Sequence, residues 1–353
     1  MKQPAFKLSV CTPAHNAADR IPELYKSLQQ QTEQRFEWIV VDDGSSDDTA
    51  AQVQAITGED PALTPDRNRG AEQDSKQNSS KSKDSKKTEA PFTVKLLSQK
   101  RGGRHTTINR ALKSAQGKFF VVLDTDSVPL PEAFERLLEH WYSLPAQERP
   151  YFASIVGLTT LPDGKIDGNR FPSSPFDSNS IEVGTHYGIT GRKWGMLHTA
   201  VFQDNPYPVF KGEKFVPDEL VLNRIGRDRL TRYINEPLLI VQPIGQEEAG
   251  TTTKADSAQA VLSKTERLRK WTSSPRAASL FFNELTSQRV PLSYRIRASA
   301  NYVRYSMHAG VIPDDIYKQA NKKLFAFFML WPGLFLYKHD KKVLSRAGMS
   351  VDS

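Results

Sequence analysis

The stretch of sequence that decides the fold reads Phe119-Phe120-Val121-Val122-Leu123-Asp124-Thr125-Asp126. Its five apolar residues predict a buried β-strand, and two carboxylates follow that strand directly. In parallel α/β sheets, ligands bind beyond the carboxyl ends of the strands. Carboxylate oxygens in such a place suit Mg²⁺ or Mn²⁺, hard cations that bridge to phosphate oxygens. An isolated Asp-x-Asp is more often a solvated turn or a helix cap, but the position after this strand favours a ligand site.

Strands and helices alternate on both sides of this stretch. Apolar runs predict further strands at residues 8–12, 38–41, 94–97, 152–158 and 238–242. Helical spacing of apolar residues predicts helices at residues 19–31, 49–56, 106–115 and 131–142, and a further helix that starts after Pro217. Such alternation predicts an α/β fold in which helices flank a mixed, mostly parallel sheet.

Two segments break the pattern, and the end of the chain changes it. Residues 58–90 are crowded with Ser, Lys, Asp, Gln and Asn, which predicts a disordered polar insert; a basic docking loop is the alternative. Residues 168–195 are rich in turn residues and are expected to be irregular. Helices are predicted at residues 258–270, 276–286, 294–309 and 314–337. We therefore expect an α/β domain over residues 1–245 and a helical extension over residues 246–353.

Composition narrows the class of protein. The 353 residues include 48 basic and 40 acidic side chains, a net charge of +8, and 38% are hydrophobic, which is a globular profile. The single cysteine, Cys11, excludes an intramolecular disulfide framework and a zinc site built on several cysteines. No signal peptide is visible and no apolar run reaches the ~20 residues that span a bilayer. A cytoplasmic protein is the expectation.

Three polar loops accompany the Asp-x-Asp stretch. The two that follow strands read Thr12-Pro13-Ala14-His15-Asn16 and Val40-Val41-Asp42-Asp43-Gly44-Ser45. The third reads Arg101-Gly102-Gly103-Arg104-His105-Thr106-Thr107-Ile108-Asn109, and its glycines and cations ahead of a helix suit an anionic ligand. It fits neither the dinucleotide fingerprint nor the P-loop. Taken singly, the first could instead be a plain strand-to-helix loop, the second a helix-capping loop and the third a solvated basic turn.

Together these four motifs resemble the family 2 glycosyltransferases of the GT-A fold. They stand in the family's order, and the resemblance covers roughly residues 6–245. It implies that Pro13, Ala14 and His15 line the nucleotide base, where His15 replaces a commoner tyrosine. It further implies that Asp43 bonds the base, that Arg104 lies near base or phosphate, and that Asp124 faces the ribose. Asp126 would then be the metal ligand, next to Ser127, where many members carry a third acid.

An inverting transferase also needs a general base for the acceptor hydroxyl. The family usually places an Asp at a helix start with an Arg six residues later, and Asp218 with Arg224 fits that spacing. Asp218 is therefore the first candidate, Glu219 the second and Glu213 the third. A carboxylate that caps the helix N-terminus is the alternative role for Asp218, and the two roles are compatible.

The resemblance implies an inverting, metal-dependent glycosyltransferase with a bound divalent cation, Mn²⁺ or Mg²⁺. The expected partners are a nucleotide-sugar donor, with a UDP-sugar favoured, and a glycan or lipid-linked acceptor, in the synthesis of cell-surface glycan. A nucleotidyltransferase acting on sugar phosphates is one alternative, although it would normally carry a glycine-rich loop after the first strand. A non-catalytic nucleotide-sugar-binding adaptor is the other.

The end of the chain adds an expectation of its own. Between Thr251 and Ser353, 17 Lys and Arg face 7 Asp and Glu, a net charge of +10, while the rest of the chain carries −2. An apolar stretch, residues 324–337, lies between lysines and contains Trp331 and Tyr337. These features favour peripheral attachment to an anionic membrane on its cytoplasmic side. A buried core helix or a dimer contact is the alternative, and no nucleic-acid-binding module is recognised.

Overall fold

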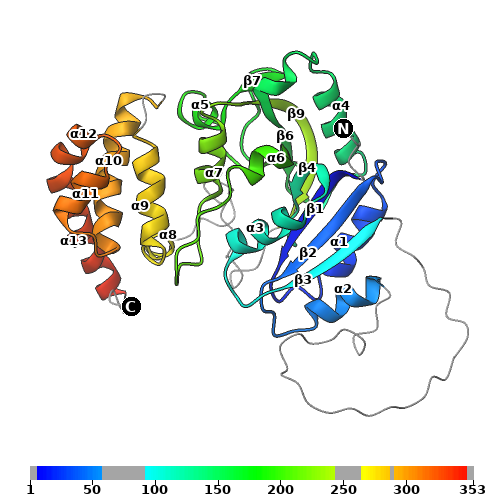
Figure 1. The fold of residues 1–353 in the computed structure, drawn as a ribbon, viewed down its shortest axis with the longest axis horizontal. Coiled ribbons are helices and arrows are strands. Elements are labelled where there is room, and N and C mark those ends of the chain that lie inside the picture. Colours follow the sequence, from blue (N-terminus) through cyan, green and yellow to red (C-terminus); the bar gives the residue numbers. More distant parts are fainter. Residues whose placement is uncertain (1–5, 58–91, 243–263, 287–289, 348–353) are drawn as a thin grey trace, which may run out of the picture.

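The computed structural model describes residues 6–57, 92–242, 264–286 and 290–347, and confirms the α/β fold (Figure 1). One sheet runs through the molecule in the order β3-β2-β1-β4-β8-β6-β9-β5, with β7 paired to β9. Its strands are β1 (Phe6–Ala14), β2 (Phe36–Asp42), β3 (Thr93–Ser98), β4 (Gly117–Val122), β5 (Ser127–Pro129), β6 (Phe152–Thr160), β7 (Phe176–Ser178), β8 (Lys193–His198) and β9 (Leu230–Val241).

Helices cover both faces of the sheet, and a further group of helices lies beyond one end of it (Figure 1). Those of the first two-thirds are α1 (Ile21–Gln29), α2 (Thr49–Thr57), α3 (Arg104–Ser114), α4 (Ala133–Tyr142), the 3₁₀ turn Arg149–Tyr151, α5 (Ser180–Thr185), α6 (Thr199–Gln203) and α7 (Asp218–Ile225). The extension comprises α8 (Lys264–Thr272), α9 (Pro275–Glu284), α10 (Leu292–His308), α11 (Pro313–Gln319), α12 (Lys323–Phe328) and α13 (Leu330–Arg346).

Two hydrophobic cores lie on opposite faces of the parallel strands. Successive side chains of a strand point to opposite faces, so Phe119 and Val121 join one core and Phe120 joins the other. The first core receives α1 and α4, and the second receives α3, α7 and Ala277 of α9. Because both faces are covered, the central strands are buried and mostly apolar, with Ser9, Thr12 and Glu37 as buried polar exceptions. The carboxyl ends of β1, β2 and β4 are thereby fixed side by side.

The extension is packed onto the sheet domain at its first helices. Ala277 is fully buried in the second core, and the Phe215 ring packs edge to face on Trp271 with centroids 5.5 Å apart. Arg224 of α7 also pairs with Glu284 of α9 at 2.6 Å. The predicted boundary at residue 245 and the predicted disordered insert at 58–90 lie outside the described residues, so both stay predictions.

Three predicted elements need correction. The single helix predicted over residues 314–337 is three helices, and Asn283 binds the first of the two breaks, between α11 and α12. Its side chain donates to the Gln319 carbonyl at 3.0 Å and accepts from the Asn321 N–H at 2.8 Å, which satisfies groups that a helix end leaves unpaired.

The turn-rich residues 168–195 are not irregular throughout. They contain β7, α5 and the start of β8, and the Asn179 side chain caps α5 by accepting the N–H groups of Ile181 and Glu182. Strand β9 begins at Leu230, eight residues earlier than predicted. Its Pro237 lies where the register against β6 shifts, a place at which a missing ladder N–H is tolerated.

A buried carboxylate on β2 links the parallel strands through hydrogen bonds, and its substitution tests how much this link contributes to stability. Glu37 of β2 is fully buried and accepts hydrogen bonds from Ser9 Oγ, the Gln116 N–H and Lys95 Nζ, each at 2.6 Å. Glu37→Gln should lower the free energy of unfolding by about 1–3 kcal/mol, because the amide nitrogen cannot accept. Denaturant unfolding measures this, with exposed Glu132→Gln as the control. Equal stabilities of the two variants would contradict it.

Candidate active site

The predicted site residues gather at the carboxyl edge of the parallel strands. β1 lies between β2 and β4, and the backbone continues these pairings beyond the strands. The Asp43 N–H donates to the Ala14 carbonyl and the Leu123 N–H to the Cys11 carbonyl, each at 2.8 Å. The loops that follow the three strands therefore start from one place, and Asp43 and Asp124 stand on two of them.

Asp43 organises the loop that precedes α3. Its side chain is buried, and its two oxygens accept the N–H groups of Gly102 and Gly103, each at 2.8 Å. Gln99 Nε2 adds a third bond at 2.8 Å. Gly103 has φ 94°, and a Cβ there would come within 2.3 Å of the Lys214 carbonyl oxygen, so only glycine fits. Its absent side chain lets the segment before α7 approach the start of α3.

The first loop, predicted to line a nucleotide base, lies against the second. His15 Nδ1 is 3.2 Å from the Asp43 carbonyl oxygen, and the Asn16 side chain accepts the Ser46 N–H at 2.9 Å. Ala14 is buried, whereas Pro13 and His15 are partly exposed. The structure thus places Pro13, Ala14 and His15 beside Asp43, and their contact with a base stays a prediction.

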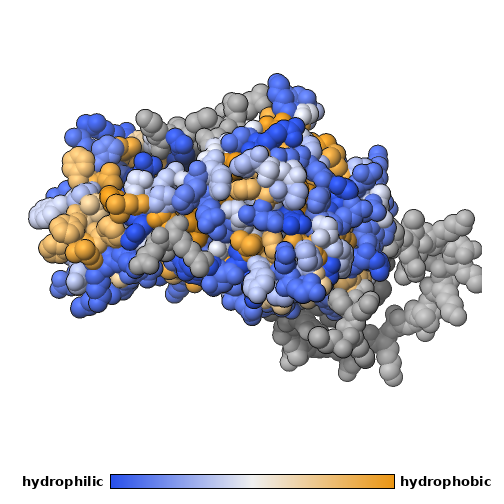
Figure 2. Space-filling view, turned by 90° about the horizontal axis from the view of Figure 1, so that it is seen from above, coloured by the Kyte–Doolittle hydropathy of each residue, from blue (hydrophilic) through white to orange (hydrophobic). Residues whose placement is uncertain are grey.

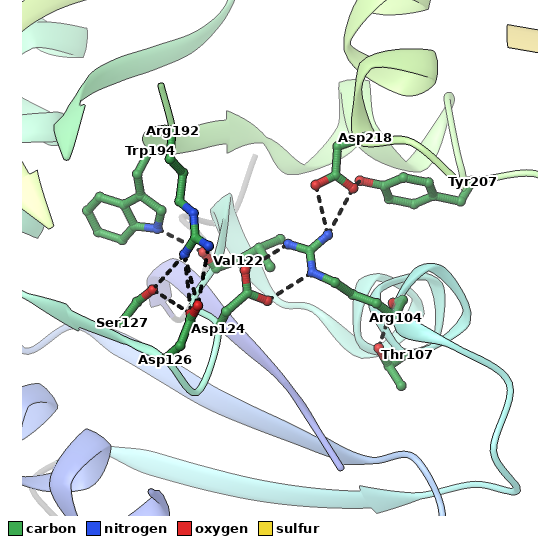
Figure 3. A network of polar contacts seen from close by, with 10 residues as sticks. All are labelled: Arg104, Thr107, Val122, Asp124, Asp126, Ser127, Arg192, Trp194, Tyr207 and Asp218. Atoms are coloured by element: carbon green, nitrogen blue, oxygen red, sulfur yellow. Dashed lines mark hydrogen bonds and ion pairs between the residues drawn. The ribbon is translucent and has the colours of Figure 1, made fainter. Parts of the chain in front are cut away.

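Arg104, at the first turn of α3, joins two acidic residues that are far apart in sequence (Figure 3). Its Nε and Nη2 donate to the two oxygens of Asp124 at 2.9 and 3.1 Å. Its Nη1 donates to both oxygens of Asp218, at 2.8 and 2.9 Å. The three side chains are 17–20% exposed, so this interaction is largely removed from water.

Electrostatics keep Asp124 and Arg104 of this group charged. Burial opposes ionisation of Asp124, but the charge and hydrogen bonds of Arg104 outweigh it, with help from Arg192, and lower the pKa of Asp124. The charges of Asp124 and Asp218 likewise overcome the burial of Arg104 and raise its pKa well above the usual value. Asp124 and Arg104 are therefore both ionised at neutral pH.

Tyr207 completes the group on the side of Asp218 and was missed in the sequence. Its hydroxyl donates to Asp218 Oδ1 at 2.6 Å, and the Asn109 side chain holds its backbone through two bonds of 2.8 and 3.0 Å. Burial and the negative charge of Asp218 raise the pKa of Tyr207 well above 10, so the phenol stays protonated. No recognisable motif surrounds Tyr207 in the sequence; only the fold brings it to Asp218.

Asp126 forms a second buried pair, with Arg192, which was also missed. Arg192 Nη1 and Nη2 each lie 3.2 Å from Asp126 Oδ2, and Nη1 lies 3.3 Å from Oδ1 (Figure 3). The side chains are 4% and 8% exposed. Arg192 precedes β8, which runs antiparallel to β4, so the start of β8 meets the end of β4 where Asp126 stands. The Gly191-Arg192-Lys193 cluster was a weak signal inside a segment expected to be irregular.

The three candidates for the general base differ in their surroundings. Glu213 is buried and accepts the N–H groups of Arg276 and Ala277, each at 2.9 Å, so it caps the first turn of α9. Asp218 accepts from Arg104 and Tyr207 as described. Glu219 reaches solvent, yet protein surrounds it closely enough that desolvation, with the charge of Asp218, raises its pKa to about 7.

Comparison with known families bears on this arrangement. The profile of the family described as "Glycosyl transferase family 2" matches residues 9–72 and 74–156, which contain Asp43, Arg104, Asp124 and Asp126. The matched residues, less than half of the chain, carry the sequence pattern of a glycosyltransferase family 2 domain. Arg192, Tyr207, Asp218 and Glu219 lie beyond the matched segments.

Individual relatives and solved structures agree with this assignment. Undecaprenyl-phosphate 4-deoxy-4-formamido-L-arabinose transferases are similar to this chain: that of Pseudomonas syringae is 27% identical over 135 residues, and that of Sodalis glossinidius 28% over 138. The aligned parts are 37% and 38% of this chain, and only about a third of each relative, 32% and 33%.

The fold is similar to that of S. aureus TarS. The TarS 1-349 structure solved with UDP-GlcNAc aligns over 98% of this chain and 93% of that chain, with a TM-score of 0.54 and 16% identity. The longer TarS structure aligns over 96% of this chain and 55% of its own, with a TM-score of 0.52 and 15% identity. These likenesses confirm the GT-A fold, and they extend over the C-terminal helices.

As arranged here, Asp124 and Asp126 do not fit a divalent cation. Both oxygens of Asp126 already accept N–H groups of Arg192, and both oxygens of Asp124 accept from Arg104. In the part of the chain that the structure describes, no group of three or more His, Cys, Asp or Glu side chains could hold a metal. A cation at Asp126 stays a prediction, one that requires Arg192 to move.

This conflict gives a direct test. Arg192→Gln leaves the buried Asp126 carboxylate unpaired and should destabilise the protein by about 3–5 kcal/mol. Mn²⁺ should then stabilise the variant against heat more than it stabilises the wild type, because it can replace the lost positive charge at Asp126. Thermal unfolding with and without Mn²⁺ measures the difference.

Two controls complete this test. The double variant Asp126→Asn with Arg192→Gln should lose the response to Mn²⁺, and the exposed Arg110→Gln should behave as wild type. If Mn²⁺ stabilises wild type and Arg192→Gln equally, the pair with Arg192 does not obstruct a metal site.

Proposed function

We propose that this protein is an inverting glycosyltransferase that moves a sugar from a nucleotide-sugar donor to a hydroxyl acceptor. The observation that carries the proposal is the convergence of Asp124 and Asp218 on Arg104, in a chain whose residues 9–72 and 74–156 match the family 2 glycosyltransferases. TarS, which shares the fold, was solved with UDP-GlcNAc, so a UDP-sugar is the proposed donor. The names of the relatives support a lipid-linked acceptor, hence a role in cell-surface glycan synthesis at the cytoplasmic face of a membrane.

The donor would lie along the carboxyl edge of the strands. Pro13, Ala14, His15 and Asp43 would contact the base, since their loops start from the same backbone pairings. Asp124 stands next along the edge, where the ribose is expected, and Arg104 and Arg192 are the cations nearest to it. Guanidinium groups bind phosphate oxygens well, so both would offset charge on the leaving diphosphate once it displaces the carboxylates that they now bind.

Glu219 serves as the general base in this proposal. The Asp218 carboxylate already accepts from Arg104 and Tyr207, which leaves it to orient Arg104. Glu219 is accessible and has a pKa of about 7, suited to taking a proton at neutral pH. The acceptor oxygen attacks the anomeric carbon as its proton passes to Glu219. The bond from that carbon to the diphosphate breaks, and the nucleoside diphosphate leaves with the electron pair, which inverts the carbon.

Donor selection tests the proposed reaction class. A thermal-unfolding panel of UDP-, GDP- and dTDP-sugars should show a selective rise in melting temperature, since a ligand at 100 times its dissociation constant adds ~2.7 kcal/mol of stability. The stabilising donor should also release its sugar slowly to water. Stabilisation without turnover would favour an adaptor, and pyrophosphate-dependent chemistry on sugar phosphates a nucleotidyltransferase; either result contradicts the proposal.

The pH dependence of turnover tests the assignment of the base. A base with a raised pKa is active only when ionised, so kcat/KM should rise with pH through about 7 and then level off. Glu219→Gln should lower kcat by about 10²–10⁴-fold and abolish this rise. The exposed Asp228→Asn serves as the matched control and should keep both. A rise through pH 7 that persists in Glu219→Gln would assign the titration to another group.

A further inference from the structure

Five large apolar side chains of α12 and α13 point into solvent. They are Leu324, Phe327, Phe328, Trp331 and Phe335, with exposed fractions of 69%, 62%, 61%, 77% and 71%. We call them the outer stripe. Figure 2 shows hydrophobic residues gathered at the helical end of the molecule. Exposed apolar residues on a protein surface are normally scattered singly. A group that lines up on one face usually marks a binding surface.

The outer stripe follows the period of a helix across both elements. Its residues are spaced i, i+3, i+4, i+7 and i+11, which places them on one face. The helical hydrogen bonds continue through the junction, because Met329 donates to the Phe325 carbonyl and Gly333 to the Met329 carbonyl, each at 2.9 Å. The apolar face that would normally meet a core is thus turned outward as one surface.

The opposite face fixes this orientation. Gly333 packs so closely on α10 that a Cβ there would lie 2.5 Å from Val303 Cβ. Ala326 is buried, and Asp340 is fully buried where it pairs with Arg304 at 2.5 Å and His308 at 3.0 Å. Rotating α13 to bury the outer stripe would expose Asp340 and break both pairs. The stripe is therefore a stable feature of the fold.

Basic side chains continue the same face. At 100° per residue, Lys338, Lys342 and Arg346 follow Phe335 on the side of the outer stripe, and all three are exposed. Asp340 is the one acidic residue in the α12 and α13 sequences, and it faces inward. The outer surface of α13 is thus apolar at its start and basic at its end, so its charge complements an anionic partner.

We propose that the outer stripe docks on an anionic lipid bilayer. Apolar side chains with tryptophan enter the headgroup boundary, while adjacent lysines and arginines meet lipid phosphates. No described helix is long and apolar enough to cross a membrane, so α12 and α13 lie along the surface. A second copy of the chain would bring the same basic residues with it, which favours lipid over self-association.

Vesicle sedimentation of the full chain tests the docking. Wild type should pellet with phosphatidylglycerol–phosphatidylethanolamine vesicles and much less with phosphatidylcholine vesicles. The triple variant Phe327→Ser, Trp331→Ser, Phe335→Ser should pellet at least ~10-fold less, and it should fold normally because these side chains are exposed. The double variant Tyr151→Ser, Val209→Ser removes two equally exposed apolar side chains elsewhere and should pellet like wild type.

Further measurements separate lipid from other occupants. Lys338→Glu with Lys342→Glu should lose the preference for anionic vesicles; an unchanged preference overturns the electrostatic part. Wild type that stays in the supernatant overturns the docking, as does a lipid-free dimer that the triple variant converts to monomer without any vesicle binding. These assays contain no donor or acceptor. Failure of the membrane inference would therefore leave the proposed transferase activity standing, and the reverse holds too.

Discussion

One guanidinium shared by two carboxylates organises the functional end of the molecule. Arg104 binds Asp124 at the tip of β4 and Asp218 at the start of α7, positions 94 residues apart in the numbering. These charges are largely shielded from water, so removing one partner would leave the others without a compensating charge. The three side chains are therefore tightly constrained to these positions. The approach also depends on Gly103, whose missing side chain admits the segment before α7. The sheet fixes the position of Asp124, and Asp124 orients Arg104. Arg104 in turn positions Asp218 and, with it, the neighbouring Glu219.

The sequence predicted the site correctly where a functional side chain comes directly after a β-strand. Apolar runs ending in Asp43 and Asp124 predicted both the strands and the edge at which these residues meet, because carboxyl ends of parallel strands share one side of a sheet. It was uninformative where partners come from antiparallel strands or loops. Arg192 and Tyr207 reach the site only through the pairing of β8 with β4 and the anchoring of Tyr207 by Asn109. Residue type and spacing carry no record of those tertiary pairings.

The same limit explains the corrections. The break between α11 and α12 depends on Asn283, some forty residues earlier in the chain, which binds backbone groups on both sides of it. The sequence motif predicts Asp126 as a metal ligand. Its partner in the structure is Arg192, because β8 lies next to β4. Local pattern thus predicts which residue types occupy the edge, while strand order decides what each of them faces.

A continuous series of packing contacts joins the candidate active site to the outer stripe. Glu213, five residues before Asp218, caps α9, and Arg224 at the other end of α7 pairs with Glu284 of α9. The ring of Phe282 in α9 stacks on Tyr305 of α10 with centroids 5.4 Å apart, and α10 holds α13 through Gly333. The first three of these contacts are charged, hydrogen-bonded or aromatic, and the last is a close backbone approach, so the helices have little freedom to slide. If the protein docks through α12 and α13 as proposed, these contacts would hold the proposed base, Glu219, in a set position relative to the bilayer that carries the proposed lipid-linked acceptor.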